Sequence, residues 1–187
     1  MPQRNIQFNT PILFLVFNQP DITMITFEEI KKIKPKQLFI SADGPRINNK
    51  KDKKECLEVR DLILDKVDWD CDIKTRFLDT NMGCKKAVSS GITWFFSHVD
   101  KGIILEYDCL PSRSFFGFCE KMLRKYESNP KVMSITGTNH IGYKNITDDS
   151  YFFSRIPSIW GWATWKDAWV KWDSDCLNHK LILDNIN

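Results

Sequence analysis

Residues 11–18 read PILFLVFN, an apolar run without polar alternation that ends in Asn18. A strand with one face in water alternates apolar and polar residues, whereas a strand covered on both faces is apolar throughout. The run therefore predicts a strand in the interior of a parallel sheet.

The segments that follow this strand alternate between helical and extended patterns. Residues 22–33 (ITMITFEEIKKI) carry apolar residues at helical spacing and a basic end, which suits the carboxyl end of a helix. Residues 36–45 (KQLFISADGP) predict a second buried strand that closes in an Asp-Gly-Pro turn. Further helices are expected over residues 51–67, 82–99 and 112–128, and further strands over residues 72–78, 102–105 and 131–137. This alternation predicts an α/β fold with a doubly wound, mostly parallel sheet.

The bulk composition fits one globular domain over residues 1–187. The chain is 42% hydrophobic and 27% charged, and its net charge of +3 is spread along the sequence. A spread charge does not favour a nucleic acid partner. We interpret the lysine run (Lys50, Lys51, Lys53 and Lys54) as a solvated helix start, with an anionic partner as the alternative.

Cysteine usage and hydropathy indicate the compartment. The six cysteines have irregular spacing and no CxxC pair, which favours free thiols in a reducing compartment over a zinc site. No apolar run approaches the roughly 20 residues of a membrane span, and the polar start MPQRNIQFNT lacks the apolar core of a signal peptide. We expect a cytoplasmic protein without a transmembrane segment; peripheral contact with a membrane stays open.

Polar residues follow three of the predicted strands: Asn18 the first, Asp43 the second, and Glu106 with Asp108 a later one. In doubly wound sheets, ligands bind beyond the carboxyl ends of the strands. Because these ends meet at one edge of the sheet, we expect the functional site there.

The two acids of the later strand form the most informative pair. They flank Tyr107 in the segment GIILEYDCLP (102–111), and strand alternation predicts that both carboxylates point to one side. Acids at a strand end can also cap the next helix, but Ser112 is available for that role. Hard oxygen ligands suit Mg²⁺ or Mn²⁺, which bind through one or two carboxylates plus substrate phosphates. The pair therefore predicts a metal-diphosphate site.

Several nucleotide-binding motifs are missing from the sequence. No G-x-G-x-x-G follows the first strand, so a dinucleotide cofactor is not expected, and no G-x-x-x-x-G-K-[ST] phosphate loop is present. The Gly-rich loop with arginine that a sugar-phosphate nucleotidyltransferase needs is also absent after Asn18. A nucleotide must then be held by side chains.

Five segments together resemble the GT-A glycosyltransferases, in particular bacterial enzymes related to the N-acetylglucosaminyltransferase I family. In order they are PILFLVFNQPD, FISADGPR, DTNMGCKKAVSSGITWFF, GIILEYDCLPSRSFFGFCEKML and SYFFSRIPSIWGWATW, and the likeness covers roughly residues 10 to 172. It implies a metal-dependent enzyme, with Mn²⁺ or Mg²⁺, that moves a sugar from a UDP-sugar donor to a saccharide or glycan acceptor, with inversion by analogy. It also implies a nucleotide-binding part over about residues 10–110 and an acceptor-side part over about 111–187.

The resemblance further implies roles for residues at the strand ends. Phe17 or Asn18 would lie near the base, and Asp43 would pair with the uracil edge. Arg76 and the segment 81–86, which includes Asn81 and Lys85, would lie along the diphosphate and donor sugar.

The metal motif of the family is a short acidic cluster, which stands here as Glu106-Tyr107-Asp108. The resemblance implies that Asp108 binds the metal directly and that Glu106 contacts the donor sugar or ribose. Tyr107 departs from the all-acid version, so its own ribose contact is left open.

No carboxylate identifies itself as the general base that the acceptor hydroxyl needs. Asp148, Asp149, Asp167 and Asp173 are candidates, although each fits a loop, cap or helix surface better than the role of a base. Similar chains continue past the tryptophan-rich segment, so the base is expected outside a chain that we interpret as C-terminally truncated.

Tryptophans are concentrated in residues 160–172. Trp162, Trp165, Trp169 and Trp172 are spaced by three, four and three residues, which predicts one helical stripe packed in the core. Trp160 precedes that helix in a loop. Its ring can stack there on a donor or acceptor sugar, or it can be a loop residue without a ligand contact. Residues 137–140 (GTNH) are expected to face the same cleft.

Two other functions remain open at this point. The chain can be a non-catalytic nucleotide-sugar-binding or scaffold domain, since no base is found. A sugar nucleotidyltransferase shares the sheet and the metal, but it requires the missing Gly-rich loop.

Overall fold

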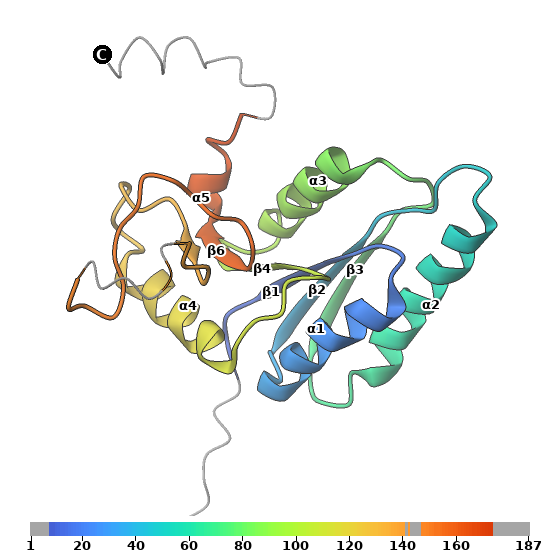
Figure 1. Cartoon of the computed structure of the whole chain (residues 1–187), viewed down its shortest axis with the longest axis horizontal. Coiled ribbons are helices and arrows are strands. Elements are labelled where there is room, and N and C mark those ends of the chain that lie inside the picture. Colours follow the sequence, from blue (N-terminus) through green and yellow to red (C-terminus); the bar gives the residue numbers. More distant parts are fainter. Residues whose placement is uncertain (1–7, 141, 143–146, 174–187) are drawn as a thin grey trace, which may run out of the picture.

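The apolar run forms β1 (Ile12–Val16), at the centre of the parallel part of a six-stranded sheet. The computed structural model describes residues 8–140, 142 and 147–173 (Figure 1). In it β1 pairs in parallel with β2 (Gln37–Ala42) and β4 (Lys101–Glu106), and β2 pairs in parallel with β3 (Asp72–Phe77). This confirms the predicted α/β fold with a mostly parallel sheet.

Two antiparallel strands extend the sheet beyond β4. β6 (Trp162–Trp165) pairs with β4, and β5 (Ile135–Thr136) pairs with β6, which gives the order β3-β2-β1-β4-β6-β5. The sheet is therefore mixed at one end. The predicted strand over 131–137 exists only as the short edge strand β5.

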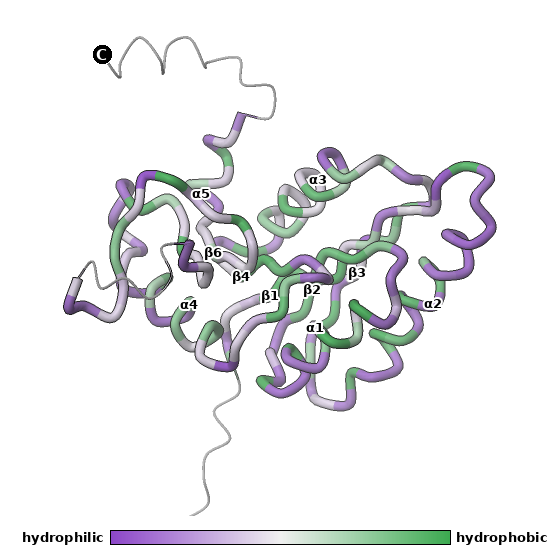
Figure 2. The backbone as a smooth tube through the Cα atoms, viewed as in Figure 1, coloured by the Kyte–Doolittle hydropathy of each residue, from purple (hydrophilic) through white to green (hydrophobic). Residues whose placement is uncertain are grey.

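Helices cover both faces of the sheet. α1 (Pro20–Ile33), α2 (Lys50–Lys66) and α4 (Arg113–Lys125) pack on the face that carries Phe14, whereas α3 (Cys84–Phe96) packs on the face that carries Leu13. Short α5 (Lys166–Trp169) lies on the α3 side. Figure 2, which is coloured by the hydropathy of each residue, shows hydrophobic residues along the central strands. Burial on both faces explains the apolar run, because neither side of β1 meets water.

The predicted helical stripe of tryptophans is wrong for residues 162–165. These residues form β6, where Trp162 packs on the α3 side and Trp165 on the α4 side. The core packing expected of them is confirmed, since both are buried. Trp169 lies on α5, and its ring stacks on that of Trp172 with the centroids 4.8 Å apart.

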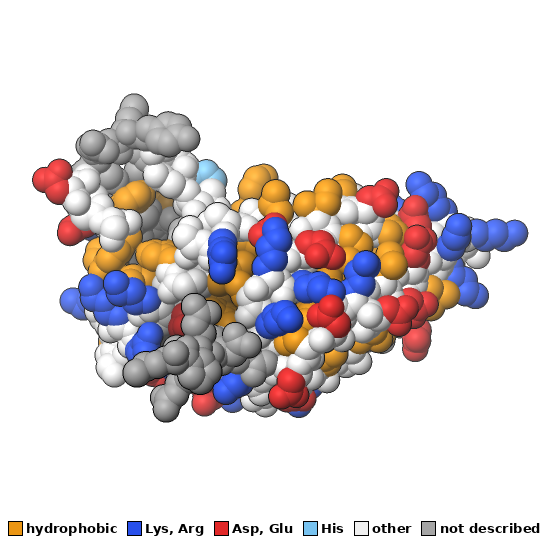
Figure 3. Space-filling view, turned by 90° about the horizontal axis from the view of Figure 1, so that it is seen from below, with side chains coloured by type: hydrophobic (Ala, Val, Ile, Leu, Met, Phe, Trp, Pro, Cys, Tyr) orange, Lys and Arg blue, Asp and Glu red, His pale blue; other side chains and the backbone are white. Residues whose placement is uncertain are grey.

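The structure also tests the expected helix cap at Ser112 and the expected helix start at the lysine run. Ser112 occupies the N-cap position of α4, but its side chain makes no capping hydrogen bond and contacts the hydroxyl of Ser114 instead. The prediction that the lysine run begins a solvated helix is confirmed, because α2 starts at Lys50 and the four lysines are exposed. Figure 3 shows acidic and basic side chains interspersed on the face that carries α1 and α2.

The described residues can be compared with the expectations about cysteines and membrane spans. The five cysteines in the described ranges are free, with Cys56 and Cys119 buried; Cys176 lies outside those ranges. Among the described residues, no helix combines the length and apolarity that crossing a membrane requires.

A close approach between α3 and β4 gives a test of this packing. A Cβ built on Gly102 would lie 2.3 Å from the ring of Phe95, which is fully buried, and 2.8 Å from the carbonyl oxygen of Pro11. We expect Gly102→Ala to lower the free energy of unfolding by about 1–3 kcal/mol through overpacking. Urea denaturation followed by circular dichroism measures this change.

The matched control is Gly117→Ala, on α4, where an added Cβ meets nothing within 4 Å. Alanine in a helix interior should raise stability by about 0.5–1 kcal/mol. Equal midpoints for the two variants would contradict the described contact between α3 and β4.

Candidate functional site

The candidate site lies at the edge where the four parallel strands end. Their register places Glu106, Leu15, Ser41 and Arg76 in one row across β4, β1, β2 and β3. Residues paired in this way point to the same face of a sheet, which here is the α3 side. The structure thus brings two predicted site residues, Glu106 and Arg76, to opposite ends of one row.

The charge of Asp108 acts on Glu106, but the two acids do not lie together on one extended strand. β4 ends at Glu106, and the next residues form a turn closed by a 3.0 Å hydrogen bond from the amide of Cys109 to the carbonyl of Glu106. Asp108 is therefore an exposed turn residue. The premise of two acids on one extended strand is wrong, because Asp108 lies in the turn that follows β4.

The electrostatics of the pair suit a cation. Burial, and then the charge of Asp108, raise the pKa of Glu106 above its ordinary value. Both causes penalise the ionised form, and a cation bound between the two groups would reverse the penalty. The described residues contain no cluster of three or more His, Cys, Asp or Glu side chains fit for a metal. A cation at Glu106 and Asp108 would thus need further oxygen ligands, such as phosphates.

Tyr107 ties this turn to α1. Its amide donates to the carbonyl of Leu15 at 2.9 Å, and its own carbonyl accepts from the hydroxyl of Thr26 at 2.7 Å. Its phenol accepts a 3.1 Å bond from the side-chain amide of Gln19, just before α1. These contacts hold the turn that carries Asp108. A contact between Tyr107 and a ribose stays a prediction.

Asp43 and Asn81, which were both expected to bind the donor, contact each other. Asp43 is buried, and one of its carboxylate oxygens accepts from the side-chain amide of Asn81 at 2.9 Å. The other oxygen accepts from the amides of Gly44 and Met82. Asp43 therefore joins the loops that follow β2 and β3. Its pairing with a uracil edge stays a prediction.

Gly44 makes that junction possible. A Cβ on this residue would lie 2.4 Å from the backbone of Thr80, so only glycine permits the two loops to approach so closely. Arg60, on α2, fastens the same loops through bonds to the carbonyls of Asp43 at 3.1 Å and Leu78 at 2.7 Å.

Asp52 is a buried carboxylate at this edge that the sequence analysis did not single out. It accepts from the amide side chain of Asn18 at 2.9 Å and from the guanidinium of Arg46, through both Nε and Nη2. The Arg46 guanidinium holds the pKa of Asp52 down, at about 2. A signal was present in the sequence, because Asn49 caps α2 and an acid three residues later is a capping pattern.

Arg46 and Phe17 contact each other beyond the end of β1. The guanidinium of Arg46 lies 5.7 Å from the ring centroid of Phe17, and the Arg46 side chain is 59% exposed. Asn18 is buried beneath them against Asp52. The two residues expected near a base, Phe17 and Asn18, thus share one network with an exposed cation.

Arg76 is held against α3. Its guanidinium donates to the hydroxyls of Ser41 at 3.2 Å and Ser90 at 3.0 Å, so it lies over β2. Since β2 and β4 are two strand spacings apart, roughly 10 Å, Arg76 and Glu106 can contact only different parts of an extended ligand. Lys85 is exposed in the first turn of α3, which follows Gly83 and has no capping side chain.

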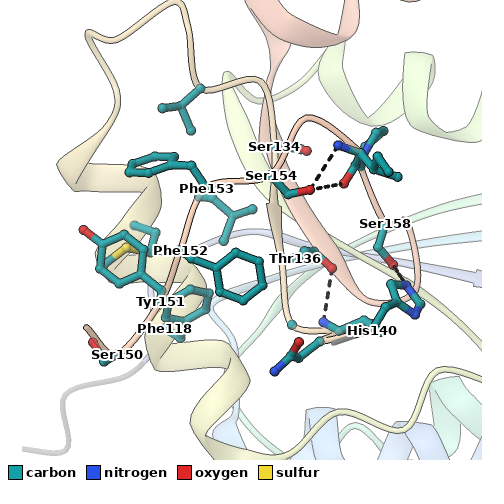
Figure 4. A pocket seen from close by; sticks show the side chains of 18 of the residues that line it. Phe118, Ser134, Thr136, His140, Ser150, Tyr151, Phe152, Phe153, Ser154 and Ser158 are labelled. Atoms are coloured by element: carbon teal, nitrogen blue, oxygen red, sulfur yellow. Dashed lines mark hydrogen bonds between the residues drawn. The ribbon is translucent and has the colours of Figure 1, made fainter. Parts of the chain in front are cut away.

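A cavity of about 1190 Å³ lies beside α4, outside the acidic pair. Its lining comes from α4, β5, residues 131–134 and described residues between 137 and 158, and it includes all four residues expected to face the cleft: Gly137, Thr138, Asn139 and His140 (Figure 4). Trp160 is outside the lining and 72% exposed, and its carbonyl accepts from the hydroxyl of Thr138. Of the four candidate bases, Asp149 lines the cavity.

Comparison with protein-family models gives no match, and comparison with curated proteins gives none either. Among solved structures, the chain is similar to a 4-diphosphocytidyl-2C-methyl-D-erythritol synthase from Anaerococcus prevotii, with 12% sequence identity and a TM-score of 0.49. That match covers 92% of this chain and 84% of the other. A likeness of this degree carries no argument about activity, so the site rests on the geometry described above.

The Asp52 network predicts a pH-dependent stability. Because the pKa of Asp52 is about 2 in the folded chain, below its ordinary 3.8, the network stabilises the fold above pH 4 and loses this contribution as the pH falls toward 2. We expect Asp52→Asn to unfold at lower urea concentration than the parent at pH 7. The gap between the two midpoints should narrow as the pH falls from about 4 toward 2.

Asp65→Asn is the control, since it removes an exposed acid of the same helix. Its midpoint should follow that of the parent at each pH. A gap between Asp52→Asn and the parent that is unchanged from pH 7 to pH 2.5 would contradict the assigned network.

Proposed function

We propose that this chain is a metal-dependent glycosyltransferase domain that moves a sugar from a UDP-sugar to a saccharide acceptor. The observation that carries the proposal is the pair of Glu106, the last residue of β4, and Asp108, in the turn that follows; burial and then the charge of Asp108 raise the pKa of Glu106. Two neighbouring carboxylates at the carboxyl edge of a parallel sheet suit a divalent cation shared with a diphosphate. The resemblance of the sequence motifs to those of GT-A glycosyltransferases supports a sugar nucleotide as the ligand that carries this diphosphate.

The strand ends supply a place for each part of the donor. Phe17, Asn18 and Asp43 would lie at the base, and exposed Arg46 joins them there as a cation beside the ring of Phe17. Glu106 would contact the ribose or the donor sugar, and Asp108 would hold the metal. Arg76, Asn81 and Lys85 would lie along the diphosphate.

The residues near the pair would hold and orient the leaving group. When bound, Mn²⁺ or Mg²⁺ would neutralise the charge that develops on the departing nucleoside diphosphate. The first turn of α3 faces the same strand edge, and its uncapped amides and Lys85 favour an anion there. Arg76, held by Ser41 and Ser90, keeps a fixed positive charge over β2.

We assign no described carboxylate to the general base. Asp149 lines the cavity beside α4, but Asp148, Asp167 and Asp173 do not line it. Binding of the donor without transfer is the alternative function, and nucleotide binding is common to both.

The first test of the proposal is titration calorimetry of UDP binding in Mn²⁺ and again in EDTA. We expect binding that is selective for UDP over GDP and CDP and that is lost in EDTA. Asp108→Asn should lower the UDP affinity in Mn²⁺ by about tenfold or more, which corresponds to the loss of about 1.4 kcal/mol from one charged ligand.

Asp167→Asn serves as the matched control, because Asp167 is an exposed acid on α5 away from the strand edge. It should bind UDP as the parent does. Unchanged metal-dependent affinity in Asp108→Asn would remove the metal assignment, and no UDP binding in the parent would overturn the proposed function.

A further inference from the structure

The cavity beside α4 is elongated along that helix. Ser114, Phe118, Met122 and Tyr126 line it and recur every four residues, so they lie on one face of α4. Twelve residues of helix span roughly 18 Å. The volume of about 1190 Å³ also exceeds the 300–1,000 Å³ that is typical of a small-molecule pocket.

One end of the cavity is lined by residues that follow the acidic turn closely in sequence. Ser112, which lines it, follows Asp108 by four residues, and Ser114 stands in the first turn of α4. Tyr126, at the end of α4, lines the opposite end. A ligand that lies along the cavity would therefore have one end at the residues that follow the turn of Asp108 and the other at the end of α4.

Aromatic rings gather at the far end. The ring of Tyr151 lies 6.2 Å from that of Phe118, 6.3 Å from that of Tyr126 and 6.0 Å from that of Phe153. Lys125 donates a 2.6 Å bond to the phenol of Tyr151. Phe153 is 67% exposed although it packs on two tyrosine rings, so its position is set while much of its surface stays accessible.

The opposite wall carries hydroxyl groups. Figure 4 shows Ser134, Thr136, Ser154 and Ser158 on the side away from the rings of Tyr151 and Phe153. Three of these hydroxyls are held by hydrogen bonds: Thr136 accepts from the amide of Thr138, Ser154 bonds to the backbone of Ile156, and Ser158 contacts His140.

This division matches the two surfaces of a pyranose sugar. The ring of a sugar presents C–H groups on its face, which pack on aromatic rings, and hydroxyl groups on its rim, which exchange hydrogen bonds with serine and threonine. The charged groups of the lining, Lys131, Arg155 and Asp149, carry both signs. Mixed charge favours a ligand without net charge over a phosphorylated one.

We propose that the cavity is the acceptor site and that it takes a neutral oligosaccharide of several pyranose units. This inference rests on the proposed function. The reacting unit lies at Ser112 and Ser114, beside the turn of Asp108. A distal unit packs on the exposed ring of Phe153 and on Tyr151. Length is thus a recognition feature of the acceptor, since a single sugar fills only one end.

The test is saturation-transfer NMR on the full chain without nucleotide or metal. The probes are two neutral series of one to five units, β-1,4-linked N-acetylglucosamine and α-1,4-linked glucose. At least one series should bind, with affinity that rises about tenfold or more from the monomer to the trimer. Binding by neither series, or affinity that does not depend on length, would overturn the proposal.

Variants at the distal end locate the binding. Phe153→Ala should weaken trimer binding about three- to tenfold, the value of one aromatic contact, and Phe153→Tyr should restore it. Leu57→Ala, at a half-exposed residue on the outer side of α2, is the control and should bind as the parent does. Trimer binding that is unaffected by Phe153→Ala would place the sugar elsewhere and overturn the proposal.

The two proposals fail separately. Oligosaccharide binding without any UDP binding would overturn the proposed function and would leave the cavity as a sugar site alone. UDP binding without oligosaccharide binding would overturn only the acceptor assignment.

Discussion

The fold depends on one constraint: neither face of β1 meets water. Its five residues are buried, so both edges must be paired and both faces covered. β2 and β4 satisfy the edges, while α1, α2 and α4 cover one face and α3 covers the other. Only the end of the strand is left for polar groups. Polar chemistry therefore concentrates where β1 and its parallel neighbours end, at Asn18, Asp43 and Glu106.

Local pattern was sufficient for the parallel half of the sheet but not for the mixed end. The apolar run and the alternation of strands with helices are local signals, and they predicted β1 to β4 correctly. The prediction of one helix that carries the tryptophans failed, because spacings of three and four residues also occur when a short strand leads directly into a helix. Pairing of β6 with β4 joins Trp165 to Lys101, far away in sequence, and no local pattern contains that information.

The site, like the sheet, has residues that the local sequence marks and contacts that it does not. Polar residues after apolar runs marked Asp43 and Glu106, because strand ends can be recognised locally. Their partners could not be predicted: the bond from Asn81 to Asp43 needs two loops to meet, and the bond from Asn18 to Asp52 needs α2 to pack beside β1. Asp52 was also hidden by its neighbours, since a lysine run reads as solvated surface although one face of its helix is buried.

The antiparallel pairing of β6 has a consequence for how such a domain can diversify. The chain leaves β4 after Glu106, forms α4 and the edge strand β5, and returns to pair with β4 at Trp162, which lies opposite Ile104. Residues 107–161, with Asp108, α4 and the cavity, thus form one excursion whose two ends are neighbours. Insertions within a loop with adjacent ends cost little entropy. The excursion is therefore an exchangeable module, and its length can vary while the four parallel strands keep their register.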